Sequence, residues 1–161
     1  MKHLHIGLRV IKTVIAVFLC FLVDYLRGSG MPFYSTIAAV LCIQKDMEHS
    51  FKVAKNREIA TLIGALAGSL YLFIEQNLVS VDHELLRYLI LSLLLIPVIL
   101  FAVNIHQENS VFLSCVVFLS VTINHAFESP LSFALTRLID TTIGIAVALG
   151  VNFLLPSKKD A

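Results

Sequence analysis

Two arginines stand at matching places in a repeated segment, and a threonine follows each by one helical turn. The segment R-x-I-x-T-x-I-G contains Arg57 and Thr61 and then, eighty residues later, Arg137 and Thr141. A guanidinium carries a permanent charge and a planar fork of donors suited to carboxylates. Residues four apart share a helix face, so each hydroxyl could reach the same anion. The pattern predicts two anion-binding positions. The alternatives are headgroup anchoring for the arginines, and packing or back-bonding for the threonines.

Gln44 and Asn124 match across the same offset, each at the end of an apolar stretch. Their amides could donate to an oxyanion or cap a helix at the interface. We also expect each arginine to lie at a helix N-terminus, where the macrodipole and free amide groups favour anions. The sequence thus predicts that Arg57 and Arg137 attract a carboxylate and that Gln44 and Asn124 orient it.

Small residues spaced by four form a further repeated feature. Such faces let membrane helices approach one another closely. We therefore expect two tightly packed scaffold helices, related by the repeat. The small pairs are Gly64 with Gly68, Gly144 with Ala148, and Ala146 with Gly150.

These positions must be held by membrane helices, because the composition excludes an ordinary soluble domain. Of 161 residues, 58% are hydrophobic and 14% charged, and the mean hydropathy is +0.88. Soluble domains are about 45–50% apolar and about 25% charged. A spanning helix needs about 20 mostly apolar residues. We expect an all-α protein with six spans, at 6–26, 32–44, 59–78, 85–105, 110–127 and 138–155. The polar segment 45–58 is expected to form an amphipathic interfacial helix.

The eighty-residue offset divides the chain into homologous halves, about 1–80 and 81–161, within one transmembrane domain and without a separate soluble domain. With the N-terminus inside, nine lysines and arginines fall on the cytoplasmic side and three on the outer side. This bias predicts that both termini are cytoplasmic. Three spans reverse the chain direction, so the halves form an inverted three-plus-three repeat. Such repeats place substrate sites near the membrane midplane.

Acidic residues are expected near span ends, where solvation makes a charge inexpensive. Asp24 is assigned to such an end, and Asp140 is expected to pair with Arg137 one turn before it. On this interpretation the deep interior holds no obligatory charge. The sequence contains no nucleophile–base set, metal cluster or phosphate-binding loop, so catalysis, metals and cofactors are not expected. The cysteines are interpreted as packing residues; they are Cys20, Cys42 and Cys115.

Two runs of residues together form a more specific pattern. The first is Pro32-Phe33-Tyr34, Ile37-Ala38-Ala39 and Gln44, followed by Asn56-Arg57, Thr61-x-Ile63-Gly64-Ala65 and Gly68. The second is Arg137-Leu138-Ile139-Asp140-Thr141-x-Ile143-Gly144, ending in Asn152-Phe153-Leu154-Leu155-Pro156. The combined pattern resembles the aromatic acid exporter family of bacteria, in the fusaric-acid-resistance-like superfamily, over about 7–156. The resemblance implies a six-span domain associated with efflux of small aromatic carboxylates. A more distant similarity to plant malate channels implies a path between subunits, lined by basic residues.

The preferred function is export of small organic anions, aromatic carboxylates above all, across the bacterial cytoplasmic membrane by a multi-pass homodimer. Many members of the resembled family continue into a cytoplasmic helical domain, whereas this chain stops five residues after Pro156. The alternative is therefore a non-transporting scaffold or accessory subunit that works with a partner membrane or cytoplasmic protein. A membrane enzyme acting on lipid headgroups is a third candidate, which the scattered acidic residues disfavour. No nucleic-acid partner is expected.

Overall fold

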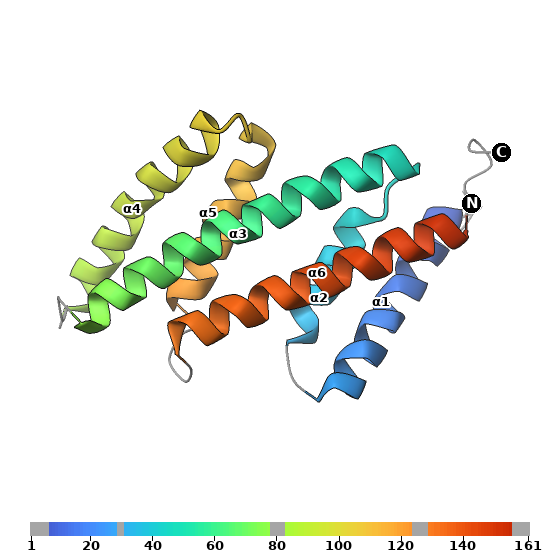
Figure 1. Ribbon diagram of the computed structural model, residues 1–161, viewed down its shortest axis with the longest axis horizontal. Coiled ribbons are helices and arrows are strands. Elements are labelled where there is room, and N and C mark those ends of the chain that lie inside the picture. Colours follow the sequence, from blue (N-terminus) through green and yellow to red (C-terminus); the bar gives the residue numbers. More distant parts are fainter. Residues whose placement is uncertain (1–6, 29–30, 78–82, 124–128, 156–161) are drawn as a thin grey trace, which may run out of the picture. The chain divides into compact units, whose positions relative to one another are not determined.

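The protein is all-helical wherever its structure is described. The computed structural model describes residues 7–28, 31–77, 83–123 and 129–155. These residues form six α-helices and one short 3-10 helix, and they contain no strand (Figure 1). The helices are α1 (Leu8–Arg27), α2 (Pro32–Cys42), α3 (Met47–Asn77), α4 (Glu84–Asn104), η1 (Glu108–Ser110), α5 (Val111–Ile123) and α6 (Pro130–Leu154).

Each of the six expected spans corresponds to one α-helix of the described residues, in the expected order, but two helices begin well before the expected spans. The polar segment 45–58 is not a separate interfacial helix, because α3 runs without a break from Met47. Asp46 caps it, with its Oδ1 accepting a hydrogen bond from the His49 backbone N–H at 2.8 Å. In the same way Ser129 caps α6 through the Ser132 N–H at 3.3 Å, ahead of Pro130 in the first turn.

These early starts correct the expected place of the two arginines. Arg57 lies about three turns inside α3, and Arg137 about two turns inside α6. Free amide groups and the macrodipole act only within the first turn of a helix. The prediction that each arginine lies at a helix N-terminus is therefore wrong, and any affinity for anions must come from the side chains.

In the described part of the chain, three helices are long and apolar enough to cross a membrane: α3, α4 and residues Leu131–Leu154 of α6. The helices α2 and α5 are apolar but shorter. The helix α1 spans 20 residues, but any 18 consecutive residues of it include three of its four charged residues, which are Arg9, Lys12, Asp24 and Arg27.

Contacts divide the chain into two compact units, to which α3 and α6 both contribute. Unit 1 contains the described residues of Met1–Lys55 and Ile139–Ala161, and unit 2 contains those of Asn56–Leu138. In unit 1, α1 packs beside α2, and in unit 2, α4 packs beside α5 (Figure 1). The core of unit 1 consists mostly of small side chains: Ala16, Cys20, Ala39, Cys42, Ile43, Ala54, Ala148 and Val151.

Glycines set how closely the helices pack within each unit. In unit 1, a Cβ at Gly144 would overlap the Ser35 carbonyl oxygen of α2 and lie 2.6 Å from the Ala38 Cβ. In unit 2, a Cβ at Gly64 would lie 2.5 Å from the Ser114 carbonyl oxygen of α5. A Cβ at Gly68 would lie 2.8 Å from the Val121 side chain. By contrast, no heavy atom lies within 4 Å of a Cβ built at Gly150.

Replacing Gly144 with alanine tests the close approach of α6 to α2, with Gly150→Ala as the matched control in the same helix. We expect Gly144→Ala to lower the free energy of unfolding by about 1–3 kcal/mol, because the methyl group meets backbone and Ala38. Gly150→Ala meets open space, and the better helix propensity of alanine should stabilise it by up to about 1 kcal/mol. Thermal unfolding in detergent measures both. Equal melting temperatures for the two variants would contradict the close approach of α6 to α2 at Gly144.

The Asp46 cap gives α3 a pH-dependent start. The His49 N–H, and next the charges of the His49 ring and Lys45, hold the pKa of Asp46 below its ordinary value of 3.8. A depressed folded-state pKa stabilises the protein above the ordinary value, and this stabilisation is lost as the pH falls through the lowered value. Asp46→Asn keeps an acceptor without the charge. We expect its melting temperature to fall less than that of the wild type between about pH 6 and about pH 3. If the melting temperatures of the wild type and Asp46→Asn fall by the same amount with pH, the pH-dependent cap at Asp46 is contradicted.

Candidate functional site

Buried ionisable side chains distinguish this helical protein from a plain hydrophobic bundle. Among the described residues, five charged side chains are at most 7% exposed: Lys12, Asp24, Arg57, Arg137 and Asp140. Ionisable groups within a membrane segment are expensive and therefore mark candidate functional sites. The expectation that the interior holds no obligatory charge is wrong. Hydropathy along the chain does not reveal which helices cover a given residue in the folded protein.

One face of α1 holds charges at both ends and small residues between them. Its buried residues are Lys12, Ala16, Cys20 and Asp24, spaced by four. Residues at this spacing stack along one face of a helix. The face therefore carries a cation near its start and an anion near its end, about 18 Å apart at 1.5 Å per residue.

The buried ammonium of Lys12 begins a chain of hydrogen bonds that joins three helices of unit 1. Its Nζ donates to Asn152 Oδ1 of α6 at 2.6 Å. Asn152 Nδ2 in turn donates to Ser50 Oγ of α3 at 2.8 Å. The Gln44 backbone N–H donates to the same Ser50 oxygen at 3.1 Å. Lys12, Ser50 and Asn152 are each at most 2% exposed, so this polar chain is shielded from solvent.

A second cation reaches this chain from the surface. The exposed Arg9 side chain donates from Nε to the Ile43 carbonyl at 3.2 Å, and from its terminal nitrogen to Gln44 Oε1 at 3.4 Å. The Gln44 amide also donates to the Leu41 carbonyl at 2.7 Å, as a cap of α2. We call these linked residues the Lys12 cluster, and its members are Arg9, Lys12, Gln44, Ser50 and Asn152.

Only Gln44 of this cluster was predicted as a site residue. From sequence, Lys12 is one of the nine lysines and arginines assigned to the cytoplasmic side, because it lies close to the N-terminus. Two signals point to it: a lysine inside an apolar stretch, and the four-residue spacing to Ala16. Its partner Asn152 lies 140 residues away, and no local pattern reveals that pairing.

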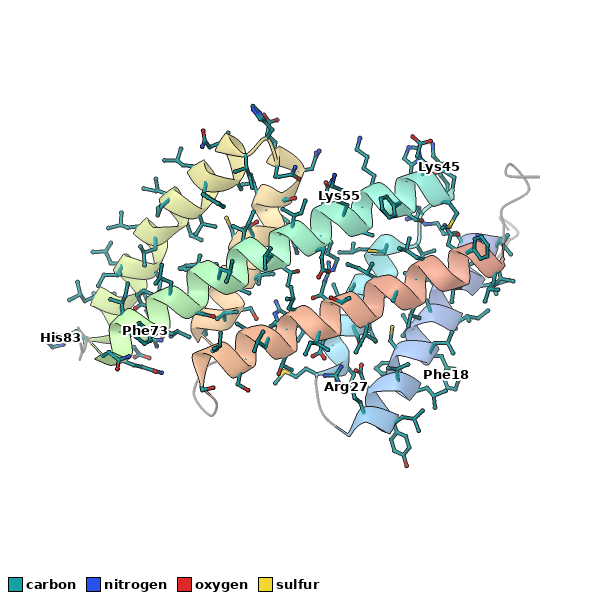
Figure 2. The ribbon with its side chains drawn as sticks, viewed as in Figure 1. Phe18, Arg27, Lys45, Lys55, Phe73 and His83 are labelled. Carbon is teal, nitrogen blue, oxygen red and sulfur yellow. The ribbon has the colours of Figure 1, made fainter. Side chains whose placement is uncertain are left out.

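The other end of α1 carries an acidic cluster. Asp140 of α6 is fully buried; it accepts from Arg27 at 2.8 Å and from the Met31 backbone N–H at 2.9 Å. Asp24 accepts a short hydrogen bond from Ser35 Oγ and lies 3.8 Å from the Arg27 guanidinium. Figure 2 shows Arg27 at this end of α1.

Two predictions are corrected by this acidic cluster. Asp24, expected to be solvated near the interface, is 5% exposed because Ser35 of α2 covers it. Asp140, expected to pair within its own helix, forms an ion pair with Arg27 across 113 residues. Helix spacing indicates which groups share a face, whereas these partners come from elsewhere in the fold.

The residues predicted to bind an anion are divided between the two units. Arg57 and Arg137 lie in unit 2, each 7% exposed, whereas Gln44 and Thr141 lie in unit 1. Thr61 Oγ1 donates to the Arg57 carbonyl at 3.0 Å, which is the back-bonding alternative. Thr141 is buried, at 2% exposure. Asn124 lies outside the described residues.

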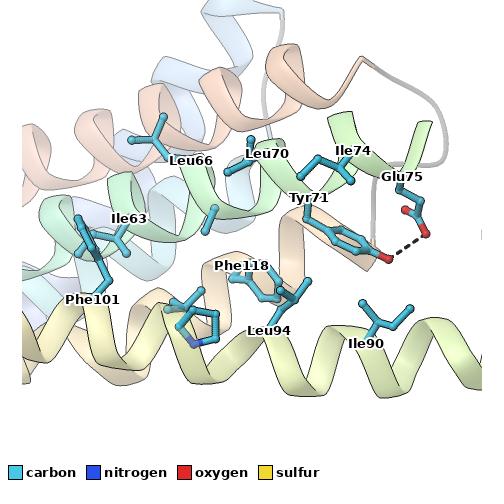
Figure 3. A pocket seen from close by; sticks show the side chains of 13 residues that line it. Ile63, Leu66, Leu70, Tyr71, Ile74, Glu75, Ile90, Leu94, Phe101 and Phe118 are labelled. Atoms are coloured by element: carbon cyan, nitrogen blue, oxygen red, sulfur yellow. Dashed lines mark hydrogen bonds between the residues drawn. The ribbon is translucent and has the colours of Figure 1, made fainter. Parts of the chain in front are cut away.

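Unit 2 contains an apolar cavity of about 730 Å³ (Figure 3). Side chains of α3, α4 and α5 line it, among them Phe101 and Phe118. At one end Tyr71 donates to Glu75 at 2.9 Å, and Arg87 donates to the same carboxylate at 2.7 Å. Because Arg87 and Glu75 neutralise each other at that end, the cavity suits an apolar group such as a ring or an acyl chain.

Comparisons with known proteins agree with this membrane architecture. The family model described as aromatic acid exporter family member 1 matches residues 4–155. No curated protein and no solved structure matches the chain. The match covers nearly the whole sequence and includes both copies of the arginine segment. The chain therefore belongs to the aromatic acid exporter family, a family of membrane transporters.

Proposed function

We propose that this protein exports small organic anions, and aromatic carboxylates in particular, across the cytoplasmic membrane of a bacterium. The observation that carries the proposal is the burial of Arg57 and Arg137 in a chain of an exporter family. An arginine that only anchors a helix at the headgroups keeps its guanidinium in the wet interface. At 7% exposure these two side chains are instead enclosed by protein, as a binding site for carboxylates requires.

The two units support an inverted repeat as the frame of the transporter. Each unit pairs two consecutive helices, α1 with α2 and α4 with α5. In unit 1, Gly144 lies against Ser35, and in unit 2, Gly64 lies against Ser114. The glycines are eighty residues apart and the serines seventy-nine, so the same contact recurs at nearly the same offset. We propose that duplication of a three-helix element produced both, with the termini in the cytoplasm.

In this proposal Arg57 and Arg137 attract the carboxylate, and Gln44 and Asn124 orient it. Thr61 and Thr141 lie one turn beyond the arginines and complete the path. A chain of 161 residues encloses little volume of its own, so we propose a homodimer with the path near the subunit junction. Exposed side chains such as Phe18 and Phe73 would face lipid (Figure 2).

Flux through proteoliposomes that contain only this chain tests the proposal. We expect the wild type to transport labelled 4-hydroxybenzoate. Arg57→Gln and Arg137→Gln should each lower flux roughly ten- to a hundredfold, since a lost charged hydrogen bond costs about 1.5–3 kcal/mol. Lys55→Gln, an exposed neighbour on α3, is the matched control and should transport normally.

The outcomes separate the roles of the residues from the function of the chain. Unchanged flux in both folded arginine variants would overturn their assignment. Absence of flux in folded wild type would overturn the transport proposal and leave the accessory-subunit alternative. Repeating the assay with an imposed pH gradient would identify the driving force.

A further inference from the structure

The Lys12 ammonium is buried without a counter-ion among the described residues. It is 2% exposed, and among the described residues its one hydrogen bond goes to the neutral amide oxygen of Asn152. An ammonium has three donors, so two of them have no described acceptor. In the described part of the chain, ion pairs involve Arg27, His49 and Arg87, and neither Lys12 nor Arg9.

The described residues around Lys12 do not supply negative charge. Asn152 and the Gln44 backbone both direct donors at Ser50, and Arg9 adds a second cation at Gln44. The nearby carboxylate of Asp46 accepts from His49 instead. The Lys12 cluster thus carries two positive charges and accepts only through neutral oxygens.

Such an arrangement is unfavourable unless an anion completes it. A buried charge is stable when it is paired and hydrogen-bonded, and an apolar side chain of similar volume is often as good or better for stability. If Lys12 served only to link α1 to α6, a neutral side chain could pack there without the desolvation of a charge. The ammonium at this position therefore points to a ligand that needs it.

We infer that the Lys12 cluster binds one oxyanion group, held by Lys12 and attracted at the surface by Arg9. Two sources offer this chemistry: the carboxylate of the exported acid, and the phosphate of an anionic lipid headgroup. The inference deepens the proposed function and rests on it only for the identity of the carboxylate. Gln44, already proposed to orient the substrate, belongs to the same cluster.

Anion-dependent thermal stability of the full chain in neutral detergent tests the inference without any transport step. A ligand that binds the folded state raises the melting temperature, and the rise grows with the logarithm of ligand concentration above the dissociation constant. We expect sodium 4-hydroxybenzoate to raise the wild-type melting temperature above that in sodium chloride of equal ionic strength. In Lys12→Met we expect an equal or higher melting temperature without ligand, and affinity at least about tenfold weaker.

Matched variants distinguish loss of the binding site from the general effect of removing a lysine charge and from misfolding. Lys55→Met removes an exposed lysine that extends away from α3 (Figure 2), and it should keep the anion-dependent shift. Lys12→Gln retains a donor for Asn152 without the charge, and it should lose the shift even if Lys12→Met fails to fold.

A lipid arm identifies the source of the oxyanion. The same proteins are compared in nanodiscs of phosphatidylcholine and of phosphatidylglycerol. A Lys12-dependent shift with 4-hydroxybenzoate assigns the site to a free carboxylate, and one with phosphatidylglycerol alone assigns it to a headgroup. If neither ligand stabilises the wild type more than Lys12→Gln, the inference is overturned. Flux that depends on Arg57 would in that case leave the proposed function standing.

Discussion

The close approach of α6 to α2 at Gly144 is the constraint on which the architecture of unit 1 depends. A side chain at this position would overlap the carbonyl oxygen of Ser35, so only glycine allows the observed separation. Asp140 and Asn152 lie one turn before and two turns after Gly144, on the same face of α6. With α6 further from α2, neither polar group would keep its present hydrogen bonds: Asp140 to the Met31 N–H, and Asn152 to Ser50.

This contact also fixes how the polar ends of two helices meet. On α1, residues spaced by four form one face that extends from Lys12 to Asp24. On α6, residues spaced by four form one face that extends from Asp140 to Asn152. The helices pair these ends in opposite order, since Lys12 bonds Asn152 and Arg27 bonds Asp140. Small residues occupy the positions between. Unit 1 thus holds a basic cluster and an acidic cluster, separated by about three turns of dry, tightly packed helix.

Much of this fold follows from sequence, and the failures have identifiable physical causes. Hydropathy predicted the number and order of the helices, and the resemblance predicted the family that the comparison found. Helix starts were missed because the capping signals at Asp46 and Ser129 lie outside the apolar windows. Lys12 was missed because its burial arises from Asn152, far away in the chain. Pairings between distant residues are a property of the packed state and leave no local pattern.

Two regions of the chain differ in how their cations are paired: the Arg87 end of the cavity in unit 2, and the Lys12 cluster in unit 1. In unit 2, Glu75 neutralises Arg87 at one end of an apolar cavity, so that region offers room for a ring or a chain but no net charge. Among the described residues of unit 1, Lys12 and Arg9 meet only neutral oxygens. An aromatic carboxylate, the substrate class proposed above, has an apolar part that suits the first region and a charged part that suits the second. A transported anion must also leave its site. When it leaves, Lys12 keeps its hydrogen bond to Asn152, although the ammonium again lacks a counter-ion among the described residues.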